Sequence, residues 1–427
     1  MTSHDWAEVR LGDSISVSHG WPFKGAEFCD PVNGLPIVIN IGNFQYTGGF
    51  RFDSTTVRAY SGEYPREYEL KPNEILLVMT CQTQGGEILG IPGRVPDDGR
   101  LYLHNQRLGR IGFRPEAQLD PEFAYWLFRS HQFNSALYRT ASGSKIMHTS
   151  PSRIEDVRMS LPSFEEQRRI AFVLSTLDDK IDSNRRLATL LEETAAAIFK
   201  ARFVDFVGVE EFEEHDTVRV PKGWQVGSIY ELADVTYGRP FKSSLFNDTE
   251  GTPLIRIRDL PANRPSVVTP EVRTDARMIG RGDIVVGMDG EFRAYVWSGP
   301  DSWLNQRVCV FDPRDGISPT FVLESIKRPL AFFEATKGGT TVIHLGKRDI
   351  DSFVVPVPPS HVMRDFGEIA DPMVELATNL KWESRGLAGL RDALLPKLIS
   401  GEIRVPDTAD PEEVIGPAAE QLVGVGT

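Results

Sequence analysis

Two stretches of the chain carry the same three polar side chains, two hundred residues apart. Residues 105–107 and residues 305–307 both read Asn-Gln-Arg. Asparagine and glutamine can each form two hydrogen bonds with adenine, and arginine pairs in the same way with guanine or holds a phosphate. These residue types therefore point to contact with nucleic acid, and their recurrence raises the question of a duplicated module.

Motifs of common enzyme chemistry are absent from the sequence. Gly346 and Lys347 resemble part of a phosphate-binding loop, but position 341 is Thr and position 348 is Arg, so the pattern fails. There is no nucleophile-elbow serine, no zinc-binding histidine pair on a helix, and no dinucleotide or amino-methyltransferase motif. We therefore predict a recognition protein without catalytic residues.

One arrangement of carboxylates could in principle hold a metal ion. Asp53 is followed by Glu69 and Lys71, a nuclease-like order that can bind Mg²⁺ through its carboxylates. The second half of the chain has no equivalent, and an acid two residues before a lysine is common by chance. We therefore assign no metal site.

The composition is that of a globular protein with two or three domains. Hydrophobic residues make up 41% and charged residues 25% of 427 residues. No apolar run reaches the length of a membrane span, and the N-terminus lacks a signal-peptide pattern. The three cysteines are far apart, which is typical of free thiols in a reducing cytoplasm. We expect a cytoplasmic protein.

The net charge of −13 is concentrated in two segments. Residues 207–217 and residues 405–427 each hold five acidic residues and no lysine or arginine, so together they account for ten of the thirteen negative charges. The rest of the chain is close to neutral and can still present a basic face, and phosphates respond to the local field. The acidity neither excludes nor supports DNA binding.

Comparison of the chain with itself reveals an internal repeat. Six matches occur in the same order, and the Asn-Gln-Arg pair is one of them. The last match aligns residues 145–162 with residues 341–358 and places His148 over His344. One such match could be accidental, but six in order indicate two copies of one module.

Each copy is followed by a long stretch with helical periodicity. After Pro162 no glycine or proline occurs for over forty residues, and Ser163 with Glu166 has the form of a capping box. Apolar residues recur every seven positions, which predicts two long helices with narrow apolar seams that pair as an antiparallel coiled coil. A helix merely packed on a globular domain, with a solvated Asn184, remains the alternative. The seam positions are Ile170, Leu177, Asn184, Leu191, Ile198, Phe366, Met373, Leu380, Leu387 and Leu394.

The predicted fold class is α+β, with two mixed α/β modules in tandem and a long helix after each. The short alternating segments bounded by turns predict the modules. The expected boundaries are a first module at 1–162, a central helix at 163–206, an acidic linker at 207–220, a second module at 221–358, a distal helix at 359–404 and a flexible tail at 405–427.

Further polar residues of the two modules could contact DNA. Lys24 and Lys242 lie in matched Pro-Phe-Lys turns, and Arg256 and Arg258 would share one face of a strand. The full set of candidates is Lys24, Thr80, Gln82, Gln84, Arg107, Lys145, Arg239, Lys242, Arg256, Arg258, Arg307 and Lys347.

Residues that are identical in both copies are poor candidates for base discrimination. Sites that recognise different bases should differ, so the repeated Asn-Gln-Arg residues are expected to support the frame or to contact phosphates. Differing neighbours such as Gln82 and Arg256 are expected to contact the bases.

Three segments resemble the specificity subunits of type I restriction-modification systems. Residues 161–206, "LPSFEEQRRIAFVLSTLDDKIDSNRRLATLLEETAAAIFKARFVDF", are similar to the central conserved region of that family. Residues 221–242, "PKGWQVGSIYELADVTYGRPFK", look like the start of its second target-recognition domain, and residues 390–405, "LRDALLPKLISGEIRV", look like the end of its distal helix. The resemblance covers residues 1–405, although Gly386 and Gly389 weaken the distal helix and put its continuity in doubt.

The resemblance implies a non-catalytic subunit that binds double-stranded DNA. Each module would recognise one half of a bipartite, asymmetric target, and the helices would set the gap. It also implies a bacterial or archaeal complex with two modification subunits, which use S-adenosylmethionine, and with restriction/translocase subunits, which consume ATP with Mg²⁺. No cofactor is expected on this chain. A nuclease or methyltransferase with unrecognised motifs and a protein-only scaffold remain alternatives.

Overall fold

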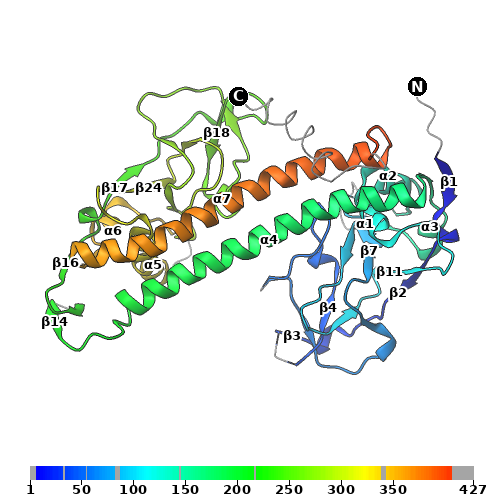
Figure 1. Cartoon of the computed structure of the whole chain (residues 1–427), viewed down its shortest axis with the longest axis horizontal. Helices are drawn as coiled ribbons and strands as arrows, with labels where there is room; N and C mark the ends of the chain where they lie inside the picture. Colours follow the sequence, from blue (N-terminus) through cyan, green and yellow to red (C-terminus); the bar gives the residue numbers. More distant parts are fainter. Residues whose placement is uncertain are drawn as a thin grey trace. The chain divides into compact units, whose positions relative to one another are not determined.

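The computed structural model of the chain forms two compact units (Figure 1). Unit 1 comprises residues 1–179 and 387–427, and unit 2 comprises residues 180–386. The structure describes residues 6–31, 34–53, 55–81, 87–143, 146–215, 218–337 and 343–405. Within these ranges, no helix is long and apolar enough to cross a membrane.

The first module contains two main sheets and three short helices. One sheet has the strand order β3-β5-β4-β10-β6 and the other has the order β2-β11-β7-β9, while β1 pairs with β13 and β8 pairs with β12. The elements are β1 (Ala7–Arg10), β2 (Ile15–His19), β3 (Phe28–Cys29), β4 (Ile37–Ile39), β5 (Ala59–Tyr60), β6 (Glu69–Leu70), β7 (Ile75–Val78), β8 (Thr80–Cys81), β9 (Pro92–Arg94), β10 (Tyr102–His104), β11 (Leu108–Phe113), α1 (Pro121–Arg129), α2 (His131–Thr140), β12 (Met147–His148), α3 (Pro151–Glu155) and β13 (Arg158–Leu161).

The second module repeats this arrangement. Its two main sheets have the orders β17-β24-β21-β22 and β19-β18-β23-β20, and β16 pairs with β25. The elements are β16 (Gln225–Ser228), β17 (Ala233–Tyr237), β18 (Thr252–Ile255), β19 (Val268–Thr269), β20 (Met278–Ile279), β21 (Ile284–Gly287), β22 (Ala294–Val296), β23 (Ser302–Leu304), β24 (Val308–Pro313), α5 (Pro319–Thr336), α6 (Lys347–Asp351) and β25 (Val354–Val357).

The strand connections confirm the internal repeat. In the first module β10 pairs in parallel with β4, and β11 lies antiparallel between β2 and β7. In the second module β23 pairs in parallel with β18, and β24 lies antiparallel between β17 and β21. The buried strands β7 and β21 consist almost entirely of branched aliphatic residues, as strands covered on both faces require. The predicted α+β class with two tandem modules is therefore confirmed.

One long helix follows each module, α4 (Phe164–Phe203) after the first and α7 (Ser360–Ile399) after the second. α4 begins at the expected cap, because the backbone N–H of Glu166 donates to the Ser163 hydroxyl at 3.3 Å. In unit 1, Glu166 pairs with Arg404 at 2.7 Å, and Asp178 pairs with Arg391. The later of these two residues on α4, Asp178, has the partner that comes earlier in the chain, Arg391. The two helices therefore run antiparallel in this unit.

The same antiparallel pairing occurs in unit 2. Lys381 on α7 forms an ion pair with Glu192 on α4 at 2.6 Å. Asn184, the one polar residue predicted in its seam, is 2% exposed and its amide donates to Glu383 at 3.0 Å. The buried amide overturns the alternative of a solvated Asn184, and a buried asparagine of this kind favours one register of the two helices.

All ten predicted seam positions lie on helix faces that are at least half covered. Those that are buried are Ile170, Leu177, Asn184, Phe366, Leu380 and Leu394, and those that are half-buried are Leu191, Ile198, Met373 and Leu387. Towards the end of α4 the buried face passes through Ala195, Phe199 and Phe203. This spacing of four follows because a straight helix of 3.6 residues per turn drifts away from a strict seven-residue repeat.

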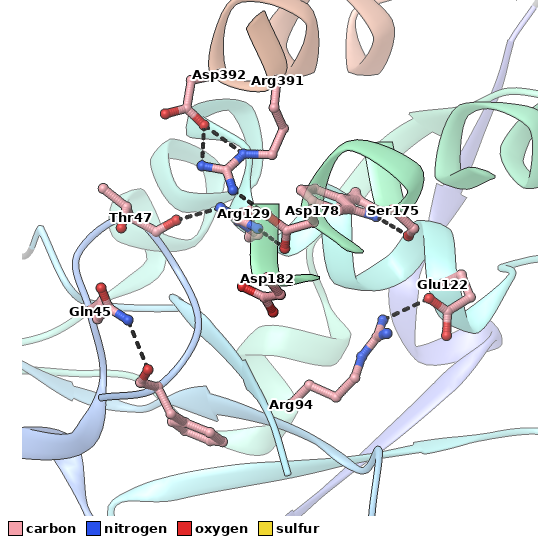
Figure 2. Close-up of polar contacts among 12 residues, drawn as sticks. Gln45, Thr47, Arg94, Glu122, Arg129, Ser175, Asp178, Asp182, Arg391 and Asp392 are labelled. Carbon is pink, nitrogen blue, oxygen red and sulfur yellow. Dashed lines mark hydrogen bonds and ion pairs between the residues drawn. The ribbon is translucent and has the colours of Figure 1, made fainter. Parts of the chain in front are cut away.

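In unit 1 a cluster of charged side chains joins the first module to both long helices. Figure 2 shows the guanidinium groups of Arg129 on α1 and Arg391 on α7 directed at Asp178 on α4. Arg129 also donates to the carbonyl oxygen of Thr47 at 2.9 Å, and Arg391 donates to Asp392 at 2.7 Å. The two guanidinium side chains are only 5% and 9% exposed. Asp178 therefore balances two buried positive charges.

The acidic segment that was expected to be a linker contains a hairpin. β14 (Phe212–His215) pairs antiparallel with β15 (Val218–Pro221), and the guanidinium of Arg219 lies over the Phe212 ring at 4.0 Å. Of the predicted tail at 405–427, Val405 is buried, and residues 406–427 lie outside the described residues.

α7 continues through Gly386 and Gly389 despite the weak helix propensity of glycine. An added Cβ at either position would meet no atom within 4 Å. We expect Gly386→Ala and Gly389→Ala each to stabilise their unit by about 1 kcal/mol, because alanine loses less backbone entropy. Thermal unfolding should show a rise of roughly 2–4 °C for each.

Gly367 supplies the matched control in the same helix. An added Cβ there would lie 2.9 Å from the Asp371 carboxylate and 3.1 Å from the Ser318 Cβ. Gly367→Ala should therefore lower the unfolding temperature. An equal response of all three alanine variants would contradict this account of α7.

Candidate nucleic-acid interface

The repeated Asn-Gln-Arg residues form the turn between two strands in each module. In the first module this turn joins β10 to β11, and the Asn105 side chain accepts a hydrogen bond from the backbone N–H of Arg107 at 3.0 Å. In both copies a glycine packs against the turn. A Cβ added to Gly20 would lie 2.4 Å from the carbonyl oxygen of Asn105, and a Cβ added to Gly238 would lie 1.9 Å from that of Asn305. The asparagine and the glycine therefore maintain the frame of the turn.

Backbone hydrogen bonds connect this turn to two other strand ends. In the first module the Met79 N–H donates to the Arg107 carbonyl, and the Met79 carbonyl accepts from the Thr149 N–H, both at 3.0 Å. We call these three residues the first strand-end junction. Segments that are distant in sequence thus present their side chains side by side.

The second module has the same arrangement. The Met288 N–H donates to the Arg307 carbonyl at 3.0 Å, and the Leu345 N–H donates to the Met288 carbonyl at 2.7 Å. These three residues form the second strand-end junction. The duplication therefore extends to the main-chain hydrogen bonds of the two sites.

The polar side chains at and beside the first junction include the hydroxyl of Thr80 and the exposed guanidinium of Arg107. Thr80 contacts His148 through its hydroxyl, 3.1 Å from Nδ1, and is 7% exposed. The guanidinium of Arg107 is exposed and has no protein partner among the described residues. An exposed, unpaired arginine beside such a turn is suited to a phosphate contact.

A surface hollow of about 640 Å³ adjoins the first junction. Its lining includes Asn40, Tyr46, Arg58, Gln106 and Arg107. Tyr46 is 58% exposed, so its ring is available to stack on a base or a sugar. Asn40 caps the short turn Ile41–Asn43 by accepting from the Gly42 N–H at 2.9 Å. The amide, aromatic and guanidinium groups here are of the kinds that bind nucleic acid.

The second junction carries a charged cluster at the same place. Asp289 lies 2.6 Å from His344 Nδ1 and 3.3 Å from Arg307 Nε. Arg307 in turn approaches the same imidazole nitrogen at 3.4 Å. Asp289 occupies the position of Thr80, since each follows the methionine of its junction and pairs with the aligned histidine. The two modules thus differ in charge at matched positions.

The predicted strand position of Arg256 and Arg258 is wrong. β18 ends at Ile255, and residues Ile257–Asp259 form a short 3-10 turn. The chain bends there because the Asp259 carboxylate accepts from the Arg256 N–H at 2.8 Å. The Arg256 guanidinium is held by Asp259 and Ser266, so that it supports this turn.

Lys24 and Lys242 do occupy matched exposed positions before short 3-10 turns. Arg239 donates to the Asp275 carbonyl at 3.3 Å and remains half exposed. Lys347 at the start of α6 is paired with Asp351 at 2.9 Å. These cations lie on the surface. Arg239 and Lys347 already have acidic partners, which a DNA phosphate would have to replace.

Three further candidates, Gln82, Gln84 and Lys145, lie outside the described residues. Four residues of the two sites are not among the contacts predicted from the sequence: Asn40, Tyr46, Arg58 and Asp289. For Asp289 a signal was present, because the matched segments that end in Met79 and Met288 place it opposite Thr80. Tyr46 and Arg58 have no counterpart in the repeat matches, and only the folded module brings them to the turn.

A family model described as the type I restriction modification DNA specificity domain matches residues 3–193 and 221–374. The two matched segments each contain one strand-end junction.

Similar proteins with curated names include the specificity subunit of the type I restriction enzyme MjaIX of Methanocaldococcus jannaschii. It is 27% identical over 341 residues, which are 75% of this chain and 78% of that protein. The specificity subunit of the type I restriction enzyme HindI of Haemophilus influenzae is 23% identical over 93% of this chain and all of that protein. A crystal structure of a type I restriction-modification S subunit from M. genitalium matches with a TM-score of 0.54 and 16% identity, over 95% of this chain and 97% of that one, which shows a common fold.

Proposed function

The chain belongs to the type I restriction-modification DNA specificity family, and on that premise we propose that each of its two modules contacts one half of a bipartite, asymmetric DNA target. The protein is the specificity subunit of such a system and is itself non-catalytic. In this proposal residues 1–162 and 221–358 are the target-recognition domains.

One observation carries the proposal: the two strand-end junctions share their main-chain hydrogen bonds and differ in their side chains. A common frame with Thr80 in one copy and Asp289 in the other is what two related modules need in order to recognise two different half-sites. The matched lysines Lys24 and Lys242, and the exposed Arg107, would contact phosphates. Phosphate contacts position a protein on DNA but do not depend on the base sequence. Gln82, Gln84, Lys145, Arg239, Arg258, Arg307 and Lys347 remain proposed DNA contacts, and Arg256 would act through the turn that it holds.

The paired long helices would set the gap between the half-sites. Each helix has 40 residues, which corresponds to roughly 60 Å at 1.5 Å per residue. The same helices would dock two modification subunits, and restriction/translocase subunits would join them for cleavage. S-adenosylmethionine, ATP and Mg²⁺ would be bound by those partners, in the cytoplasm of a bacterium or an archaeon.

The proposal is tested by DNA binding of this chain with and without its modification subunits. Alone, the chain should bind DNA weakly and with strong dependence on salt. In the complex, one duplex sequence should be bound 10³-fold or more tightly than random duplexes at physiological salt, an order of magnitude typical of specific binding. Equal affinity of the complex for all duplexes would refute the proposal. Mapping methylated adenines would then give both half-sites and the gap.

Arg107→Ala should weaken binding to all sequences to a similar extent. If its guanidinium neutralises one phosphate, the slope of log K against log salt should become less steep by about one. The matched control is Arg100→Ala, whose guanidinium already forms an ion pair with Asp98 at the surface of the same module. A loss of preference for particular bases in Arg107→Ala, at an unchanged salt slope, would contradict a phosphate contact.

A further inference from the structure

We propose that Asp289 selects the base at one position of the half-site bound by the second module, by accepting a hydrogen bond from the exocyclic amino group of adenine or cytosine. The inference rests on the proposed function and assigns a determinant of specificity within it.

Two strand ends and the segment before α6 place the Asp289 carboxylate in unit 2. Asp289 follows β21, Arg307 lies in the turn before β24, and His344 precedes α6. The Gly290 N–H donates to the Ile343 carbonyl at 3.0 Å and the Leu345 N–H donates to the Met288 carbonyl at 2.7 Å, so the backbone on both sides of Asp289 is fixed. The aspartate therefore sits on a rigid part of the site.

Neighbouring cationic and imidazole groups fix the orientation of the carboxylate. One oxygen lies 2.6 Å from His344 Nδ1 and the other lies 3.3 Å from Arg307 Nε. Two other cations of the module form ion pairs with other carboxylates: Arg293 pairs with Glu334, and Lys337 pairs with Asp349. Asp289 is thus held in one orientation while its side chain remains 25% exposed.

The carboxylate retains the capacity to bind a base. An ionised carboxylate offers about four acceptor positions, and the two contacts of Asp289 occupy one on each oxygen. In the major groove adenine N6 and cytosine N4 donate, whereas thymine O4 and guanine O6 only accept. A carboxylate pairs with the amino groups and repels the keto oxygens, which gives a chemical rule for the base at this position.

The first module shows that the frame does not require an acid here. Thr80 fills the matched position and contacts the aligned His148 at 3.1 Å. A hydroxyl both donates and accepts, so it tolerates amino and keto groups alike. The difference between threonine and aspartate, in two copies that share the main-chain hydrogen bonds of the junction, therefore changes recognition and leaves the frame intact.

Asp289→Thr in the full chain, assembled with its modification subunits, tests the inference. Methylated adenines are mapped on a plasmid library randomised in both half-sites. The wild-type complex should show one position in the second half-site that requires adenine or cytosine, with guanine and thymine disfavoured about 5- to 150-fold, the range of one good base contact. Asp289→Thr should bring that ratio close to one and leave the first half-site unchanged.

Two variants and one internal standard keep the test decisive. Asp289→Asn preserves the shape and adds an amide donor beside the remaining acceptor oxygen, so it should admit guanine and thymine at the same position without excluding adenine. Asp234→Asn removes an exposed carboxylate, paired with Arg314 at 2.7 Å elsewhere in the module, and should alter neither half-site. The first half-site reports folding and assembly in every variant.

The possible failures are distinguishable. If the wild-type complex methylates without any bipartite sequence preference, the proposed function fails. If the wild type shows a bipartite target but Asp289→Thr and Asp289→Asn retain the same bases in the second half-site, the function stands and the role of Asp289 is overturned. An equal change in both half-sites would also overturn it, because Asp289 would then act on the fold or the assembly.

Discussion

Asp178→Asn should lower the free energy of unfolding of unit 1 by about 3 kcal/mol, the lower end of the range for removing one partner of a buried ion pair. The substitution keeps the size of the side chain and removes its charge. Arg129 and Arg391 are then left as buried cations without the shared carboxylate. Asp178 itself is 28% exposed, so water compensates for part of the loss and places the effect at the lower end.

The electrostatics of Arg391 support this expectation. Burial lowers the pKa of the guanidinium, but the carboxylates of Asp178 and Asp392 outweigh burial and hold the pKa above its usual value. Without Asp178 only Asp392 remains, and its side chain is 54% exposed. The arginine then retains most of its desolvation cost and loses its strongest partner.

The loss should be measured by hydrogen exchange of the α1 amides after Pro121, because these report unit 1 alone. Asp156→Asn is the control, since its ion pair with Arg10 is exposed and should contribute at most about 1 kcal/mol. Equal effects of the two substitutions would show that the buried cluster of Figure 2 does not hold the module to the helices.

Acid should destabilise the first module through His104, by about 2 kcal/mol at pH 5 and about 3 kcal/mol at pH 4. His104 lies on β10, is fully buried, and has one ring nitrogen 2.9 Å from the Leu108 carbonyl oxygen. The other nitrogen, Nδ1, has no partner among the described residues. Burial lowers the pKa of His104 from 6.5 to about 4, since a charged imidazole cannot be solvated there.

The direction of the effect follows from proton linkage. Above pH 6.5 the histidine is neutral in both the folded and the unfolded chain, so its stability contribution is fully present. Between pH 6.5 and pH 4 the unfolded chain binds a proton that the folded chain excludes, and stability falls as the pH falls. Below pH 4 both states are protonated and the loss levels off.

The repeat provides the variant for the test, because the second module has Leu304 at the position of His104. The difference in unfolding free energy between wild type and His104→Leu, followed by hydrogen exchange of β10 and β11, should grow from pH 7 to pH 4. His131→Gln, which changes an exposed histidine on α2, should leave the pH profile unchanged. Parallel profiles for wild type and His104→Leu would mean that the imidazole is protonated in the folded module.

The amino-acid sequence is sufficient to predict the duplication, the α+β class and the two long helices. The helices and strands follow from local periodicity. The duplication follows from the ordered matches, and it means that each pattern occurs twice in the chain. The ion pair of Glu192 with Lys381 and the hydrogen bond from Asn184 to Glu383 show the antiparallel pairing that two seams separated by a globular module predict. Local spacing suffices here because a helix places residues four apart on one face wherever it occurs.

Which polar groups contact one another depends on the tertiary fold. Arg256 was predicted to lie on a strand, but the cap formed by Asp259 ends the strand one residue earlier and holds the guanidinium. Asp289 and His344 are 55 residues apart in sequence, and their contact depends on three segments that backbone hydrogen bonds join. No local pattern encodes such a meeting, because side-chain proximity across a sheet is set by strand order and by the path of the loops.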